Sequence, residues 1–363
     1  MIKNIEIKNF RCFDNLKVSG FEKINLISGK NNVGKTALLE ALFLNITPRP
    51  DTIFLLRQVR RESSKLSRSL PERTWNNFFY QQNKSSEIVI ESTLENGSSK
   101  MVEVFIDESV QNLEDTYQQD NDDDNEKLIS LFSGSQSVLS VMHLKTRINN
   151  KEAFENLIIS SAKGIIARDI KVPDIKNAFF IPSFLRVSSR ELTEEFDKAL
   201  LNEKRENELL RAFQSIDSSI IGVESLSIGE PTLYVKREGE SKLPLSLFGD
   251  AINRIADMIL RIVNNENSIL LIDEIENGIH HSNQAAFWSI IYRLANELNV
   301  QIFATTHSLE MIEAFIKSGS DYQNMAAHFE LTKHLKTGKI LAIKRDLNTL
   351  EYGISHKKEV RGE

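Results

Sequence analysis

One short segment, GKNNVGKT at residues 29–36, constrains the fold of this chain more than any other feature. It matches the pattern G-x-x-x-x-G-K-[ST], follows an apolar run at residues 24–27 and precedes an apolar-rich stretch at residues 35–45. Glycines let such a loop curl so that its N–H groups face phosphate oxygens, and the N-terminus of the following helix adds partial positive charge. The segment therefore predicts a strand, a phosphate-binding loop and a buried helix, in that order.

This loop supplies most of the residues expected to bind a nucleotide. We expect Lys35 to reach the β- and γ-phosphates of ATP and the Thr36 hydroxyl to bind Mg²⁺. The other residues expected to contact the nucleotide are Gly29, Asn31, Asn32, Val33, Gly34 and Ala37. The alternative is a chance match in a glycine turn, but the strand before the loop and the helix after it favour the phosphate site.

A second set of candidate residues follows a buried strand in the last third of the chain. Residues 269–272 (ILLI) are apolar, and Asp273 and Glu274 come directly after them. A parallel strand presents such residues at its carboxyl end, where ligands bind in open α/β sheets. We expect Asp273 to bind Mg²⁺ and Glu274 to orient or deprotonate the attacking water. Alone, the pattern is equally typical of a strand that runs into a charged turn.

His307 follows the next apolar strand, at residues 300–304, after an amphipathic helix around residues 287–298. A strand, a helix and a strand at this spacing predict a parallel βαβ unit, which would place His307 at the same sheet edge as the acidic pair. We therefore predict that His307 senses the γ-phosphate, although a lone histidine is more often a structural residue. His280 and His281 lack a surrounding ligand set, so no metal role is assigned to them.

Composition narrows the class of protein. The 363 residues include 45 Lys and Arg against 51 Asp and Glu, a net charge of −6, which argues against a protein that coats nucleic acid by bulk charge. A basic stretch at residues 55–73 is still a candidate DNA contact, with a solvated helix-and-loop face as the alternative. The single cysteine, Cys12, excludes an intrachain disulfide and fits a reducing compartment. Without an apolar run of transmembrane length or a signal peptide, we expect a cytoplasmic protein with no membrane contact.

Taken together, these segments resemble the ABC-type ATPases of the SMC, RecF and OLD group, and most of all the AAA15-type, OLD-like ATPases. The likeness covers most of residues 1–50 and 178–363, and the tail EVRGE at 359–363 also resembles the family's end, so we expect a complete chain. It is carried by IEIKNFRCF at residues 5–13, GKNNVGKTALLEAL at 29–42, PLSLFGDAINRI at 244–255, LLIDEIENGIHH at 270–281 and FATTHSLEMIEAF at 303–315.

The resemblance implies a nucleotide held between two heads, with the phosphate loop of one head facing the signature segment of the other. Ser246, Gly249 and Asp250 match that signature segment. Ala251 stands where the family often has glycine, and its methyl group would narrow the approach of the phosphate. Residues 275–281 correspond to the D-loop at the dimer seam, where Glu276 is expected to be structural or interfacial. The candidates for the Q-loop glutamine are Gln81 and Gln82.

The fold class implied is an α/β P-loop NTPase of the ABC/SMC-head type, with a mixed sheet, flanking helices and an inserted, mainly helical region. Residues 1–110 would form the N-terminal part of the head and residues 236–363 the C-terminal part. Residues 111–235 would form the insertion, with an acidic loop at 114–126 and a role in dimerisation or partner binding.

The function implied is that of an ATPase whose heads pair on nucleotide as a homodimer or higher homo-oligomer. Such pairing would scaffold or regulate a separate effector, a nuclease or toxin, in prokaryotic anti-phage defence, as in PARIS-type systems. No further acidic D-x-D pattern follows Asp273 on a strand, so we expect no nuclease domain in this chain. Two alternatives stay open: a RecF-like DNA-repair ATPase, disfavoured by the sequence DEIENGIHH at residues 273–281, and an ATP-dependent scaffold with little turnover.

Overall fold

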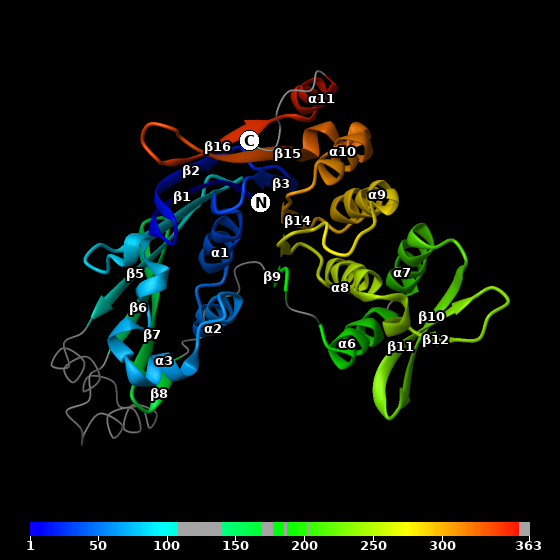
Figure 1. Cartoon of the computed structure of the whole chain (residues 1–363), viewed down its shortest axis with the longest axis horizontal. Helices are drawn as coiled ribbons and strands as arrows, with labels where there is room; N and C mark the ends of the chain where they lie inside the picture. The colour runs from blue at the N-terminus through cyan, green and yellow to red at the C-terminus, as the bar shows by residue number, and fades with distance from the viewer. Residues whose placement is uncertain (108–139, 169–176, 185–186, 202, 356–363) are drawn as a thin grey trace.

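The computed structural model of this chain describes residues 1–107, 140–168, 177–184, 187–201 and 203–355. Two large β-sheets and a group of helices make up this part of the chain (Figure 1). The predicted acidic loop at 114–126 and the tail at 359–363 lie outside the described residues. No helix in the described ranges is long and apolar enough to cross a membrane.

The first sheet is antiparallel throughout and has the strand order β2-β1-β4-β5-β6-β7-β8. Its strands alternate buried and exposed side chains, so one face of the sheet packs on the core and the other meets solvent. Asn96 and Gly97 lie in the turn that connects β4 to β5. The strands are β1 (Ile2–Phe10), β2 (Phe13–Ser19), β4 (Ile88–Leu94), β5 (Ser99–Asp107), β6 (Ser140–Ile148), β7 (Lys151–Ser161) and β8 (Gly164–Arg168).

The second sheet has the order β16-β15-β3-β14-β13-β9, and all its neighbouring strands are parallel except β16. Its central strands β3, β13 and β14 are buried at every residue because helices or the first sheet cover both faces. The predicted βαβ unit is confirmed by the parallel pairing of β13 with β14, and β15 and β16 form an antiparallel hairpin. The strands are β3 (Ile24–Gly29), β9 (Ala178–Ile181), β13 (Ile269–Ile272), β14 (Gln301–Thr305), β15 (Ala326–Lys333) and β16 (Ile340–Arg345).

Helix α1 (Lys35–Ile46) lies between the two sheets and packs on strands of both (Figure 1). Every residue of α1 except Thr36 is buried, which explains why the helix is apolar almost all round. Near it lie α2 (Pro50–Val59), α3 (Ser64–Ser69) and the 3₁₀ helices η1 (Pro71–Arg73), η2 (Asn76–Phe78) and η3 (Tyr80–Gln82).

The opposite face of the second sheet is covered by a helical layer that buries Trp288, Tyr292 and Phe315 in its core. A small sheet, β10-β11-β12, packs against the outer helices of this layer. The helices are α6 (Ser189–Leu200), α7 (Glu203–Ile216), η4 (Leu245–Phe248), α8 (Asp250–Asn264), α9 (His281–Glu297), α10 (Leu309–Ser318), η5 (Ser320–Met325) and α11 (Leu347–Ser355). The strands of the small sheet are β10 (Ile220–Ile228), β11 (Glu230–Arg237) and β12 (Leu243–Pro244).

The prediction of a mainly helical insertion at residues 111–235 is wrong for the described part of that region. Strands β6, β7 and β8 continue the first sheet by pairing outward from β5, so a boundary at residue 110 would cut one sheet in two. Strand β9 then joins the second sheet, and helices α6 and α7 are followed by β10 and β11. Helices α6 and α7 account for less of the described part of this region than its strands do.

Candidate functional site

The phosphate loop between β3 and α1 requires glycine at two positions. Gly29 has φ +147° and Gly34 has φ +93°, backbone conformations that residues with a Cβ rarely adopt. A Cβ on Gly34 would lie 2.6 Å from Cys12 Sγ, and one on Gly29 would lie 2.4 Å from the carbonyl oxygen of Leu331. The loop can therefore curl only because both positions lack a side chain.

Lys35 begins helix α1 and extends its side chain back over this loop. Its Nζ donates hydrogen bonds to the carbonyl oxygens of Gly29 (2.7 Å) and Lys30 (2.9 Å). Burial lowers the pKa of Lys35 to about 8, while the nearby carboxylates, Asp273 first among them, favour the charged form. At neutral pH the ammonium group is therefore mostly charged.

The acid predicted to bind Mg²⁺ lies next to the predicted hydroxyl ligand, although the two residues are far apart in sequence. Thr36 Oγ1 is 3.1 Å from both carboxylate oxygens of Asp273. Thr305, which ends β14, donates its hydroxyl to Asp273 Oδ1 at 2.7 Å and accepts a hydrogen bond from the N–H of Glu274 at 2.8 Å. Burial raises the pKa of Asp273, and the two hydroxyl hydrogen bonds oppose that rise.

Glu274 and His307 face each other across the carboxyl ends of β13 and β14. His307 Nε2 is 3.8 Å from Glu274 Oε1, and both side chains are more than one-third exposed. Glu276 accepts a hydrogen bond from the His307 N–H at 2.6 Å, so its observed contact is structural. Asn277 donates to Glu274 Oε2 at 2.8 Å and holds the other side of that carboxylate. The predicted base and the predicted γ-phosphate sensor thus share one edge of the sheet.

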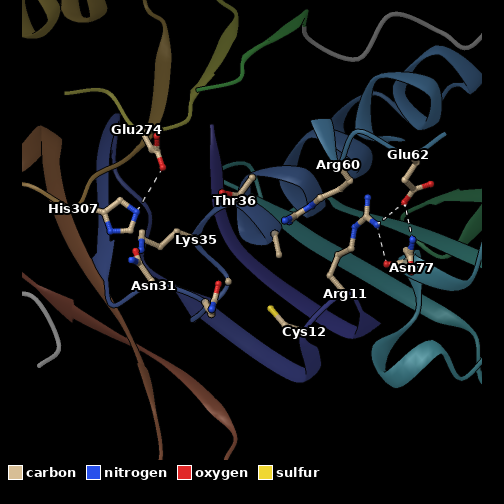
Figure 2. A pocket seen from close by; sticks show the side chains of 13 residues that line it. Arg11, Cys12, Asn31, Lys35, Thr36, Arg60, Glu62, Asn77, Glu274 and His307 are labelled. Atoms are coloured by element: carbon tan, nitrogen blue, oxygen red, sulfur yellow. Dashed lines mark hydrogen bonds and ion pairs between the residues drawn. The ribbon is translucent and has the colours of Figure 1, made fainter. Parts of the chain in front are cut away.

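A cavity of about 670 Å³ brings these groups together, as Figure 2 shows. It contains Lys35, Glu274 and His307 toward one end, with Thr36 near the middle (Figure 2). The other predicted residues that line it are Asn31, Asn32, Gly34 and Ala37. Residues that line it without having been predicted are Arg11, Cys12, Arg60, Glu62 and Asn77.

The unpredicted end of the cavity is organised around a buried carboxylate on helix α1. Glu40 has no exposed surface, and it accepts hydrogen bonds from Arg11 Nε (2.8 Å) and Arg60 Nε (2.7 Å). The Arg11 guanidinium also lies 4.2 Å from the centre of the Phe78 ring, a distance suited to a cation–π contact. One feature of the sequence pointed to this end of the cavity, because Arg11 and Cys12 belong to the segment at residues 5–13 that resembles the ABC-type ATPases.

The basic stretch at 55–73, the candidate DNA contact, is divided between the interior of the fold and its surface. Arg57 is 6% exposed and pairs with Glu62 at 3.1 Å inside the fold. Arg60 turns toward the nucleotide cavity. The exposed basic residues left in the stretch are Arg61, Lys65, Arg68 and Arg73.

The predicted signature residues lie away from this cavity. Gly249 has φ +88° and directly precedes helix α8, and Ser246 lines a separate cavity of about 390 Å³ with Asn277 and Gly278. Asp250 begins α8. The Q-loop candidates Gln81 and Gln82 are exposed or partly so in η3 and do not line the nucleotide cavity either.

Val33 and the histidine pair His280 and His281 make contacts that are structural. Val33 is buried, and its Cγ2 lies 2.8 Å from the point where a Cβ on Gly29 would stand. His280 caps the N-terminus of α9, since its Nδ1 accepts a hydrogen bond from the N–H of Ser282. Its ring contacts that of His281 at 4.1 Å between centroids.

Comparison with known proteins shows the family. The family described as "AAA domain, putative AbiEii toxin, Type IV TA system" matches residues 24–313. The chain belongs to this family. A Helicobacter pylori protein named ATP/GTP phosphatase is 26% identical, over 86% of this chain and 87% of its own length. The DNA replication and repair protein RecF of Clostridium acetobutylicum is 43% identical, over 12% of each chain.

The fold is that of an SMC head. An SMC head bound to the C-winged helix domain of ScpA superposes with a TM-score of 0.51 at 12% identity, covering 97% of this chain and 99% of that one. The predicted fold class, an α/β P-loop NTPase with mixed sheets and flanking helices, is confirmed. This AAA-family ATPase therefore carries its phosphate loop and acidic pair on an SMC-type scaffold.

Proposed function

We propose that this ATPase hydrolyses ATP with Mg²⁺ and that hydrolysis requires two heads to close on the nucleotide. The observation that carries the proposal is the continuous hydrogen-bonded set Thr36, Asp273, Thr305 and Glu274. It joins the predicted metal ligands to the predicted base at the cavity that also contains Lys35 and His307.

The donor set fits a magnesium ion. A threonine hydroxyl and a carboxylate are hard oxygen ligands, which Mg²⁺ prefers, and Thr36 Oγ1 is equidistant from both oxygens of Asp273. When bound there, Mg²⁺ would neutralise charge on the β- and γ-phosphates.

The residues of this chain would then act in sequence. Lys35 exchanges its two loop carbonyl partners for the phosphate oxygens of ATP. Glu274 accepts a hydrogen bond from the attacking water and orients it toward the γ-phosphate, or removes its proton. His307, held by Glu276 through its backbone N–H, binds the γ-phosphate.

The pairing of heads is supported by two features of the single head: its nucleotide cavity is partly open to solvent, and its own signature residues lie outside that cavity. Glu274 and His307 are partly exposed, and the signature residues Ser246 and Gly249 lie outside the cavity. Leu247, between them, is 69% exposed. A second head that presents its signature segment would cover the exposed side of the nucleotide. The likeness to an SMC head agrees with this arrangement.

We further propose that the closed heads regulate a separate nuclease or toxin effector in prokaryotic anti-phage defence, in the cytoplasm. The family description, which names a toxin of a type IV toxin–antitoxin system, supports such a setting. A RecF-like role in DNA repair is the second candidate, because of the local similarity to a RecF protein. The OLD-like resemblance of the motifs favours the first.

The test measures phosphate release and assembly mass for the wild type, Lys35→Ala and Glu274→Gln. We expect Mg²⁺-dependent turnover in the wild type, no ATP binding in Lys35→Ala, and ATP-bound dimers or larger assemblies that accumulate in Glu274→Gln. Unchanged ATP binding by Lys35→Ala in calorimetry would refute the phosphate site. Monomers in both the wild type and Glu274→Gln, with ATP and Mg²⁺ present, would refute the pairing of heads.

A further inference from the structure

Arg254 lies near the N-terminus of helix α8 and joins that helix to two strands. Its Nη2 donates to the carbonyl oxygens of Asp273 (2.5 Å) and Glu274 (3.2 Å), which follow β13. Its Nη1 donates to the carbonyl oxygens of Pro182 (3.3 Å) and Ser183 (3.0 Å), which follow β9. One guanidinium group therefore holds the signature helix against the carboxyl ends of two neighbouring parallel strands.

The charged guanidinium group of Arg254 is buried, which disfavours its charged form. Burial lowers the pKa of Arg254, and Asp273, Asp257, Glu274 and Glu276 oppose that shift. Within the part of the chain that the structure describes, its four hydrogen-bond partners are neutral carbonyl groups and its buried Nε has no partner. An apolar side chain in the same space would leave these carbonyl oxygens without their donor. The contacts of Arg254 are therefore suited to holding backbone in place rather than to filling space.

The backbone that Arg254 holds is strained at the catalytic position. Glu274 has φ +50°, a left-handed conformation that a residue with a Cβ keeps only where its surroundings enforce it. Its N–H is fixed by the Thr305 hydroxyl and its carbonyl oxygen by Arg254, so both sides of the residue are held. The direction of the Glu274 carboxylate therefore depends on where Arg254 lies.

We propose that Arg254 is a positioning residue that couples the location of helix α8 to the orientation of Glu274. The inference rests on the proposed function, in which the signature segment before α8 binds the nucleotide of the partner head. Nucleotide held by the partner fixes α8, Arg254 fixes the peptide after Asp273, and Glu274 is then aligned on the nucleotide of its own head. Hydrolysis in each head depends on occupancy of the other, so the dimer hydrolyses ATP cooperatively.

Two arginine-to-lysine changes on the same helix test this coupling. Arg254→Lys keeps the charge but cannot reach all four carbonyl groups, and a displaced catalytic group costs about ten- to a hundred-fold in rate. We expect kcat to fall by that factor, the Kd for ATP to stay within about two-fold because the phosphate loop is intact, and the Hill coefficient to fall to one. Arg261, which pairs with Asp257 at 2.8 Å, supplies the control, and Arg261→Lys should behave as the wild type.

A double mutant separates positioning from general damage to the fold. If Arg254 acts through Glu274, then adding Arg254→Lys to Glu274→Gln will not lower the residual rate further, whereas an additive loss overturns the proposal. If circular dichroism shows that Arg254→Lys does not fold, Arg254→Gln replaces it in both measurements. A wild type that neither binds nor hydrolyses ATP refutes the proposed function. A hydrolysing wild type together with an Arg254→Lys variant of equal kcat refutes only the coupling.

Discussion

Replacing Lys100 by methionine should stabilise this protein at neutral pH. Lys100 lies on β5 beneath helix α1, is 5% exposed, and donates its Nζ to the carbonyl oxygen of Ile46 at 2.8 Å. That carbonyl is the last of α1, so the ammonium group caps the C-terminus of the phosphate-binding helix. Burial, reinforced by the charge of Arg49, lowers the pKa of Lys100 from 10.5 to about 7.

The size of the effect follows from this pKa. The unfolded chain binds a proton at Lys100 up to pH 10.5, whereas the folded chain releases it near pH 7. The wild type therefore gains stability as pH rises through this window. Each pKa unit corresponds to 1.36 kcal/mol, so burying Lys100 costs about 4 kcal/mol at pH 7 and about 2 kcal/mol at pH 9. Loss of the hydrogen bond to Ile46 in Lys100→Met costs about 1–3 kcal/mol at either pH.

Urea unfolding followed by tryptophan fluorescence checks both numbers, since Trp75 is fully buried in the same core. We expect Lys100→Met to exceed the wild type by about 1–3 kcal/mol at pH 7, and this difference to shrink by about 2 kcal/mol at pH 9. Lys17→Met, at a lysine whose side chain is 66% exposed on β2, is the matched control for removing a lysine without a change in the core. A Lys100→Met difference that is equal at both pH values would refute the reasoning.

Three further predictions concern the site. Gly34→Ala should abolish ATP binding in calorimetry, because its Cβ would meet Cys12 Sγ at 2.6 Å and the backbone has φ +93°; an unchanged Kd would contradict the loop geometry. Thr305→Val should lower kcat by about ten-fold and leave the Kd for ATP unaltered, because its hydroxyl joins Asp273 to Glu274 away from the phosphate loop; steady-state kinetics with nucleotide titration would show a joint change if this assignment were wrong. Burial raises the pKa of the Cys12 thiol to about 11, so about one molecule in a thousand carries the thiolate at pH 8. Alkylation followed by mass spectrometry should therefore be slow and should be blocked by ATP, and equal labelling with and without ATP would place the nucleotide elsewhere.

Local sequence patterns predicted the parts of the site that depend on neighbours in the chain. The phosphate loop, the strand before Asp273 and the strand before His307 could each be read from glycine spacing and apolar runs. Parallel pairing of β13 with β14 then brought the acidic pair and the histidine to one edge, which the βαβ spacing had indicated. These residues needed only one long-range assumption, namely that the strands lie side by side.

Contacts between distant, individually ordinary residues could not be predicted in this way. Arg11 and Arg60 reach Glu40 from a strand turn and from the end of α2, and nothing in their local sequence distinguishes them from solvated arginines. The strands at residues 140–161 were missed for a related reason, since β6 pairs with β5, which lies before residues 108–139, and β7 in turn pairs with β6. A basic stretch whose sequence suggests a DNA-binding surface can therefore contain residues such as Arg57, which forms an ion pair inside the fold.

Helix α1 connects these separate parts into one site. Its N-terminus carries Lys35 and Thr36, its middle holds two cavity arginines through Glu40, and its C-terminus is capped by Lys100. Because α1 is packed between both sheets, a displacement at one end is carried to the other by a rigid element. The acidic pair and His307, by contrast, stand on the ends of separate strands. Substitutions within α1 should therefore change ATP affinity and stability together, whereas substitution of Glu274, which contacts the attacking water, should change kcat with little effect on either.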